Sequence, residues 1–291
     1  MTPASFDYLS PTSLDEALAL LQKHGDEARI LAGGQSLITL MKLRFTSFPY
    51  IVDLSRVETL RFIKETDGTL VIGAMTTNAE LEASETVRQK YPIIYDACSR
   101  IADPLVRNMG TIGGNLSHGD PGNDLPAVMI ALKARYQLKS AGGSRTIEAA
   151  KFYKDSFSTQ ATQNEILTQV EIPVPRKNTS GAYVKHKRRA GDFSVAGVAM
   201  TFEEDSDGTL KNAGVGLTSV GPTAIHAART EATLEGRPPD KEVIERAMEI
   251  ARAEARPTSD FYGTGEYKRF VLGALVKRSI MITLGRIAGG D

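Results

Sequence analysis

Apolar residues recur at strand-like and helical spacings over the first 174 residues of the chain. The predicted strands are residues 28–32, 50–54, 60–65, 69–74, 134–140 and 166–174. The predicted helices are residues 37–45, 77–84, 91–102 and 124–133. Asp67-Gly68 separates two of these strands and is a strong signal for a hairpin turn. This part of the chain is therefore expected to mix short strands with helices.

A turn-prone stretch at residues 173–181 is the best candidate for a linker. After it, strands are predicted first and helices later. The predicted strands are residues 181–187, 193–203 and 209–220, and the predicted helices are residues 223–236, 241–255 and 266–282. Strands followed by helices are typical of an α+β domain, here an antiparallel sheet with helices on one face.

The N-terminus has the pattern of a capped helix. Ser13 and Glu16 fit a capping box in front of the apolar residues Leu14, Leu18 and Leu21. No basic leader precedes this helix, so we expect no signal peptide. No apolar run approaches the ~20 residues that span a bilayer, so no integral membrane segment is expected.

The composition is that of an ordinary globular protein, with 41% hydrophobic and 24% charged residues. The formal net charge of zero argues against a nucleic-acid partner. The single cysteine, Cys98, excludes an internal disulfide and fits a reducing compartment, so a cytoplasmic localisation is expected. An iron–sulfur cluster needs about four ligands, and the four histidines have no metal-ligand spacing with one another or with Cys98. Redox chemistry would therefore need an organic cofactor or a partner's metals.

Three local patterns invite alternative interpretations. The acidic turn 203–208 resembles a calcium loop, but Gly214 stands where the bidentate carboxylate is required, so a hairpin turn at Asp207-Gly208 is expected. The basic run 185–189 fits a nucleic-acid patch, a solvated face or positive charge directed at an anionic cofactor. His118 lacks a nearby nucleophile motif, so loop polarity explains it better than a catalytic base.

Two glycine segments carry the strongest chemical signal. Residues 28–36 lead a predicted strand into Gly33-Gly34, with Ser36 in place to cap the next helix. Residues 110–115 repeat the pattern, with backbone N–H groups expected to be exposed at a glycine pair. Adjacent glycines allow such groups to approach a phosphate. Two ordinary tight turns are the alternative.

Polar residues beside the second segment extend this pattern. Thr111 and Asn115 flank Gly113-Gly114 as side-chain donors, and Asp120 and Asp124 follow as acceptors for hydroxyl groups. Asp124 is also expected to cap the next helix. A long ligand with phosphates and many hydroxyls, such as a dinucleotide, would use both segments. Neither the Walker nor the Rossmann glycine motif is present.

The chain resembles the FAD-binding medium subunit of the molybdenum hydroxylases, the family of carbon monoxide dehydrogenase and xanthine dehydrogenase. The resemblance runs nearly end to end. It is carried by residues 32–45, 72–82, 103–132, 183–200 and 260–279. Two long glycine motifs in the family's order make the resemblance specific.

The resemblance implies a fold and a domain division. It implies an α+β protein whose FAD-binding domain, of the vanillyl-alcohol-oxidase (PCMH) type, covers residues 1–176 in two α/β subdomains of about 1–55 and 56–176. A C-terminal domain of the carbon monoxide dehydrogenase flavoprotein type, with an antiparallel sheet and helices, is expected over residues 177–291.

The resemblance also implies the cofactor site. The two glycine segments would hold the FAD diphosphate, Asp124 would contact ribityl or ribose hydroxyls, and Lys187 would stabilise the reduced flavin, with Lys185 as its rival. Asn78, Met109 and Phe193 depart from the commonest family pattern. The residues expected to bind FAD are Ala32, Gly33, Gly34, Gln35, Ser36, Ile101, Thr111, Ile112, Gly113, Gly114, Asn115, Asp124 and Lys187.

The family implies an electron-transfer role for the chain. In such enzymes a large subunit with the molybdenum cofactor hydroxylates substrate, and iron–sulfur clusters of a small subunit pass electrons to FAD. An external acceptor then takes the electrons, and a dimer of heterotrimers is expected. No residue of this chain is expected to act as a substrate acid or base, and no metal site is expected. A stand-alone FAD-dependent oxidoreductase and a scaffold without FAD are the competing interpretations.

Overall fold

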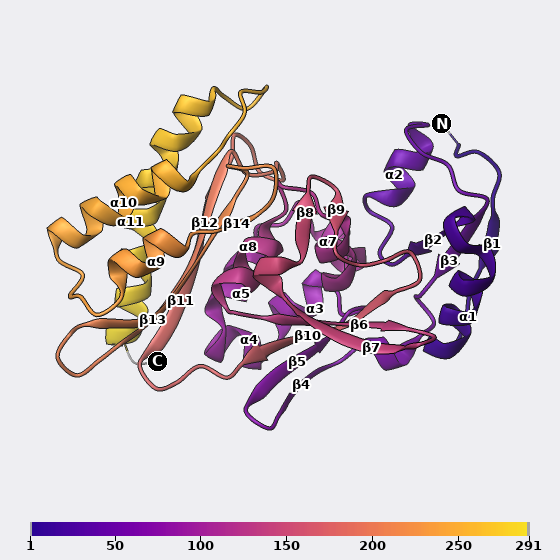
Figure 1. Ribbon diagram of the computed structural model, residues 1–291, viewed down its shortest axis with the longest axis horizontal. Helices are drawn as coiled ribbons and strands as arrows, with labels where there is room; N and C mark the ends of the chain where they lie inside the picture. The colour runs from indigo at the N-terminus through magenta and orange to yellow at the C-terminus, as the bar shows by residue number, and fades with distance from the viewer. Residues whose placement is uncertain (1, 290–291) are drawn as a thin grey trace.

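The computed structural model describes residues 2–289, which form three main sheets in succession along the molecule (Figure 1). The first sheet has the order β1-β3-β2, the second β4-β5-β10-β6-β7 and the third β11-β12-β13-β14. Within the described residues, no helix is both long and apolar enough to cross a membrane.

The first sheet is small and entirely parallel. It contains β1 (Asp7–Leu9), β2 (Ala28–Leu31) and β3 (Tyr50–Asp53), with α1 (Leu14–His24) and α2 (Leu37–Lys42) in the connections. The predicted cap of α1 is confirmed in part, because the Ser13 hydroxyl accepts a hydrogen bond from the Glu16 N–H at 3.2 Å. The Glu16 carboxylate accepts from Thr12 N–H rather than from Ser13 N–H, so the box is not closed.

The second sheet is antiparallel and lies in the middle of the molecule (Figure 1). The predicted hairpin at Asp67-Gly68 is confirmed, and both turn residues have positive φ, 49° and 72°. The strands are β4 (Ile63–Thr66), β5 (Thr69–Gly73), β6 (Arg135–Ser140), β7 (Gly143–Glu148) and β10 (Ile166–Pro173). The sequence pattern missed β7 because five of its six residues are exposed at the sheet edge, so no apolar alternation marks it.

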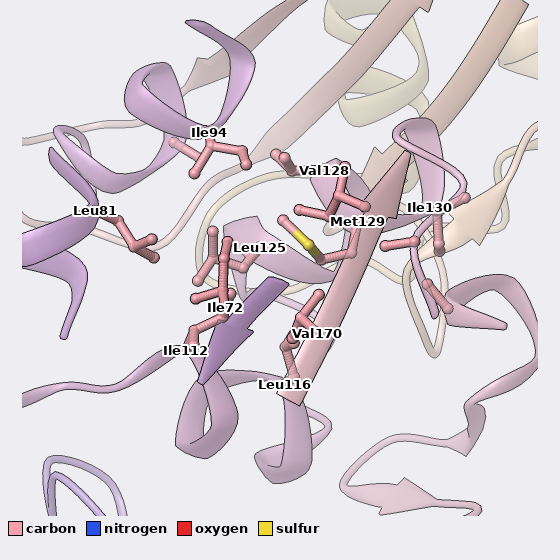
Figure 2. Close-up of a cluster of buried hydrophobic side chains, with 14 of the residues drawn as sticks. Ile72, Leu81, Ile94, Ile112, Leu116, Leu125, Val128, Met129, Ile130 and Val170 are labelled. Carbon is pink, nitrogen blue, oxygen red and sulfur yellow. The ribbon is translucent and has the colours of Figure 1, made fainter. Parts of the chain in front are cut away.

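Six helices follow the second strand of this sheet. They are α3 (Asn78–Ala83), α4 (Glu85–Lys90), α5 (Pro92–Cys98), α6 (Pro104–Met109), α7 (Ile112–His118) and α8 (Asp124–Ala131), while β8 (Tyr153–Asp155) and β9 (Ser158–Thr159) form a separate hairpin. Figure 2 shows apolar side chains of α3, α5, α7 and α8 gathered against Ile72 of β5 and Val170 of β10. This core fixes α7 and α8, which both reach the site described below.

The third sheet is covered on both faces, not on one as expected. It contains β11 (Thr179–His186), β12 (Ala196–Glu204), β13 (Leu210–Thr218) and β14 (Ile225–His226). One face packs against α9 (Ala228–Leu234), α10 (Lys241–Glu254) and α11 (Gly265–Gly289), and the other against α5 and α8. The reason is visible in β12, where residues 196–202 are all buried. The hairpin turn at Asp207-Gly208 is confirmed by the pairing of β12 with β13.

Helix α8 approaches the third sheet very closely. A Cβ atom at Gly214 would lie 2.0 Å from the Ala131 carbonyl oxygen, and one at Gly216 would lie 2.0 Å from that of Ala127. The Thr201 hydroxyl donates a hydrogen bond to the Ala131 carbonyl at 2.8 Å. The two glycines of β13 therefore let α8 rest on the strand backbone, which fixes the start of α8 relative to β11 and β12.

Candidate functional site

A cavity of about 630 Å³ lies where the first sheet, the helices α6 to α8 and the loop after β11 meet. This volume falls within the roughly 300–1,000 Å³ of small-molecule and cofactor sites. Its lining comes from residues 21–54, 74–124, 157–167 and 185–193, so distant parts of the sequence share one site.

The first glycine segment contains both a close contact and free donors. A Cβ at Gly33 would lie 2.0 Å from the Met109 carbonyl oxygen, so only glycine lets the two segments touch. Gly34 has φ 75°, which favours glycine as well. Within residues 2–289, the N–H groups of residues 33–36 have no protein acceptor. They lie at the cavity wall and are available to an anionic ligand.

Ser36 occupies the N-cap position of α2, but the expected cap is wrong. Its backbone is in the αR region, and its side chain accepts no hydrogen bond from the helix. An N-cap residue normally needs an extended backbone to bring its oxygen onto the N–H groups of the first turn. The Ser36 side chain therefore stays exposed at the cavity, next to Gln35.

The second glycine segment forms the start of helix α7, whereas exposed backbone N–H groups were expected at its glycine pair. Thr111 is its N-cap and accepts a hydrogen bond from Gly114 N–H at 3.1 Å. Gly113 N–H donates to the Ala74 carbonyl at 2.8 Å, and a Cβ at Gly113 would lie 2.6 Å from the Ala74 Cβ.

The N–H groups on either side of the glycine pair are engaged as well. Ile112 donates to the Thr76 carbonyl at 2.9 Å and Asn115 donates to the Thr111 carbonyl at 3.0 Å. The expectation that Gly113 and Gly114 expose N–H donors is therefore wrong. What this segment offers the cavity is the bare backbone of Gly114 and the polar side chain of Asn115.

Asp124 begins helix α8 but does not cap it, because Asn123 holds the cap position and makes no side-chain cap bond. The Asp124 carboxylate accepts two hydrogen bonds from β11, from the Tyr183 hydroxyl at 2.5 Å and from Lys185 Nζ at 2.6 Å. Burial raises the pKa of Asp124, and the Lys185 ammonium opposes that rise. Both Asp124 and Lys185 line the cavity.

Lys187 lies two residues after Lys185, just past the end of β11, and it is not part of the cavity lining. Burial and the neighbouring charges of Lys185, Arg100 and Arg107 lower the pKa of Lys187, while Asp124 opposes this shift. The basic run therefore contributes positive charge next to the cavity, with Lys185 as the residue at its wall.

Most residues expected in the site lie together. The cavity lining includes Ala32, Gly33, Gly34, Gln35, Ser36, Ile101, Thr111, Gly113, Gly114, Asn115 and Asp124. Ile112, the first residue of α7, is instead fully buried in the central core. Lys187 is the other expected residue outside the lining.

Residues 157–167 form a third wall of the cavity, which the sequence did not predict. Gln163 connects this wall to the first sheet by donating to the carbonyls of Gly25 and Ala28, at 3.1 and 2.8 Å. Arg145 anchors it by an ion pair to Glu165 at 2.6 Å, which lowers the pKa of Glu165 to about 2. No glycine pair or charge cluster marks this segment in the sequence, so no available signal could have identified it.

Two buried side-chain oxygens indicate that the cavity suits a polar ligand. Among the described residues, Asn78 Oδ1 and Asn115 Oδ1 have no hydrogen-bond partner, and both residues line the cavity. Buried polar atoms are normally satisfied, so a ligand with hydroxyl or amino donors would complete them. Together with the free N–H groups of residues 33–36, they fit a large ligand with an anionic part and several donors.

Comparisons with known proteins agree over nearly the whole chain. The FAD binding domain in molybdopterin dehydrogenase matches residues 4–175, and the CO dehydrogenase flavoprotein C-terminal domain matches residues 181–282. The carbon monoxide dehydrogenase medium chain of Hydrogenophaga pseudoflava is 39% identical over 288 residues, which is 99% of this chain and 100% of the relative.

Solved structures show the same arrangement. A carbon monoxide dehydrogenase from Hydrogenophaga pseudoflava that lacks the Mo-pyranopterin moiety contains a chain with a TM-score of 0.96 and 40% identity, covering 98% of this chain and 99% of that one. Quinoline 2-oxidoreductase from Pseudomonas putida 86 contains one with a TM-score of 0.91 and 31% identity, covering 100% and 99%.

Proposed function

Because this chain belongs to the FAD-binding medium subunits of the molybdenum hydroxylases, we propose that it receives electrons from a partner's iron–sulfur clusters and passes them to an external acceptor. Bound FAD supplies the redox chemistry, since it accepts electrons and releases them again. The residues of this chain bind and orient FAD, exclude water from it and adjust its potential.

The observation that carries this proposal is the cavity between the two glycine segments. The N–H groups of residues 33–36 are free donors at its wall, and such a backbone cluster suits a diphosphate. Gly114 lets a ligand approach the start of α7, and Asn78 and Asn115 offer oxygens for its hydroxyl or amino donors. The first segment would hold the diphosphate, and Gly114 of the second segment would leave room for it.

The rest of FAD would extend along the remaining walls. Ile101 is proposed to lie against the flavin ring because it is an apolar member of the lining. Lys185 and Lys187 place positive charge on that side. Ile112 is proposed to support the site from the core, through the position of α7.

The chain lacks the ligands for clusters of its own, because it has a single cysteine and that residue is buried in the central core. This supports electron entry from another protein. We propose a small iron–sulfur subunit as the donor, a large molybdenum subunit as the substrate-converting partner and a dimer of heterotrimers as the assembly. The relatives are named for reactions as different as carbon monoxide and quinoline oxidation, which supports a substrate choice made outside this chain.

The domain division of this subunit is proposed as 1–176 for FAD binding, with subdomains of about 1–55 and 56–176, and 177–291 for the C-terminal domain. The family matches at 4–175 and 181–282 support it. The first sheet and the second sheet would then be the two parts of the FAD-binding domain.

Electron entry is tested by mixing the FAD-loaded chain, without oxygen, with its iron–sulfur partner subunit in reduced form. The proposal predicts rapid loss of the visible flavin absorption, with electrons delivered in proportion to the partner added. A chain stripped of FAD is the control. If the flavin stays oxidised with the reduced partner but is bleached by a chemical reductant, the electron-transfer role is wrong although FAD binding stands.

A further inference from the structure

We infer that Asp96 of α5 and Arg286 of α11 are positioning residues for the FAD site, because their ion pair fixes β11 to the FAD-binding domain. Neither residue belongs to the cavity lining. They act on the cavity through β11, which carries Lys185 to its wall. This inference rests on the proposed function, and it gives helix α11 a part in that function.

The Asp96 carboxylate and the Arg286 guanidinium meet at two points. Arg286 Nη2 donates to Asp96 Oδ1 at 3.0 Å, and Nη1 donates to Oδ2 at 2.8 Å. A two-point contact fixes the orientation of both groups as well as their separation. The Asp96 side chain is only 9% exposed and that of Arg286 is 31% exposed, so solvent screens this pair less than it screens an exposed ion pair.

The same two residues bind the free edge of β11. This strand is the edge strand of the third sheet, and an edge strand leaves a row of N–H and C=O groups without a partner strand. Tyr183 N–H donates to Asp96 Oδ2 at 3.1 Å, and the Tyr183 carbonyl accepts from Arg100 Nη1 at 3.3 Å. The Gly181 carbonyl accepts from Arg286 Nη1 at 2.6 Å. Hydrogen bonds to charged groups are stronger than neutral ones, so these contacts hold β11 on α5.

This attachment of β11 lies close to the cavity. Lys185 is two residues after Tyr183, which places it roughly 7 Å further along the strand. The Tyr183 hydroxyl and Lys185 Nζ both donate to Asp124, at 2.5 and 2.6 Å. Asp124 and Lys185 both line the cavity. A shift of β11 relative to α5 would therefore displace part of the cavity wall, although every lining residue is still present.

An ion pair that only stabilised the fold would behave differently. Breaking it would lower the unfolding temperature but leave the FAD affinity of the folded chain unchanged. Breaking a positioning pair changes the affinity of the folded chain as well, since a site whose support is loosened loses contacts with its ligand. Affinity measured well below the unfolding temperature therefore separates the two roles.

The test measures the dissociation constant of FAD by ultrafiltration, for the full chain mixed with its iron–sulfur partner subunit. The variants are Asp96→Asn, Arg286→Met, Arg286→Lys and the double variant Asp96→Asn with Arg286→Met. Val243→Ala is the control for stability, because it removes buried apolar atoms from α10 and leaves the ion pair intact. Thermal unfolding of each variant sets the temperature at which affinity is measured.

Asp96→Asn is expected to raise the dissociation constant roughly tenfold, the size of one lost hydrogen bond to a charged group. Arg286→Met has a smaller effect, because Arg100 still pairs with Asp96 at 3.5 Å. Arg286→Lys keeps the charge but not the two-point contact, so its effect is smaller again. In the double variant the two effects do not add, because both changes break the same pair. Val243→Ala lowers the unfolding temperature and leaves the dissociation constant unchanged.

Two results would overturn the inference alone. One is a wild-type dissociation constant in folded Asp96→Asn and Arg286→Met variants, since the pair would then only stabilise the fold. The other is an equally raised constant in Val243→Ala, since the effect would then come from lost stability in general. If Asp96→Asn does not fold, the two Arg286 variants decide between these outcomes. Failure of the wild-type chain to bind FAD would instead contradict the proposed function, and this inference with it.

Discussion

The two glycine segments look alike in sequence but do different physical work. In the first, residues 33–36 keep their backbone N–H groups free at the cavity wall. In the second, the N–H groups of residues 112–115 are all used inside the protein, because the segment is the capped start of α7. A glycine pair in the sequence therefore indicates that another group comes close to the backbone. That group can be a ligand or another segment of the protein.

Gly33→Ala is expected to have the largest effect, because its methyl group would lie 2.0 Å from the Met109 carbonyl and must push the two segments apart. We expect loss of FAD binding and a free energy of unfolding lower by about 1–3 kcal/mol, the usual cost of overpacking. Thermal unfolding and bound-flavin content measure both. Gly285→Ala is the matched control, because nothing lies within 4 Å of its Cβ. If Gly33→Ala behaves like this control, the close contact is unimportant.

Gly113→Ala separates packing from ligand binding. Its methyl group would lie 2.6 Å from the Ala74 Cβ, so α7 must move away from the end of β5. We expect a loss of about 1–3 kcal/mol in stability. FAD affinity below the unfolding temperature should fall less than in Gly33→Ala, because the N–H groups of residues 112–115 are bonded within the protein and are not ligand donors. Titration of both variants with FAD gives the comparison, and equal losses of affinity would contradict it.

The N-cap residues of α2 and α7 should differ in their contribution to stability, by a smaller amount than the glycine variants. Thr111→Ala removes a real cap and should lower the free energy of unfolding by about 1 kcal/mol. Ser36→Ala removes a hydroxyl that caps nothing and should leave stability unchanged. Chemical denaturation of the two variants measures the difference. A similar cost for both would mean that Ser36 caps α2 after all.

The smallest expected effect is the pH-dependent stability contributed by the Arg145–Glu165 ion pair, which anchors the third wall of the cavity. The hydrogen bond from Arg145 holds the pKa of Glu165 at about 2 in the folded chain. Since this pKa is depressed, the ion pair stabilises the fold above the unfolded pKa of about 4.3, and the contribution is lost as pH falls toward 2. The stability difference between wild type and Arg145→Met should therefore shrink on acidification through this range. A constant difference in urea unfolding would show that Arg145 acts by packing alone.

Much of the fold follows from sequence pattern, and the misses have physical causes. Strand β12 begins with a long apolar run, and in β10 apolar residues recur among polar ones from Leu167 to Ile172, so the positions of both are readily predicted. Strand β7 was missed because its residues are mostly exposed, and the second cover of the third sheet was missed because a one-dimensional pattern does not identify what packs on a buried face.

The site was predicted in part for similar reasons. The glycine pairs and Asp124 are visible in the sequence, and they do line one cavity. Which N–H groups are free depends on contacts with distant residues such as Ala74 and Thr76, and no local pattern contains that information. The choice of Lys185 over Lys187 at the wall likewise depends on where β11 ends relative to α8.

The most direct test is the visible absorption spectrum of the purified chain, with chromatographic identification of the cofactor released on denaturation. The account predicts about one FAD per wild-type chain, the occupancy of a single cofactor site. It predicts none in Gly114→Val, whose side chain would fill the space between Thr111 and Ala32 where the ligand must approach. A wild-type chain that stays colourless with added FAD and its iron–sulfur partner, or a fully loaded Gly114→Val variant, would contradict the account.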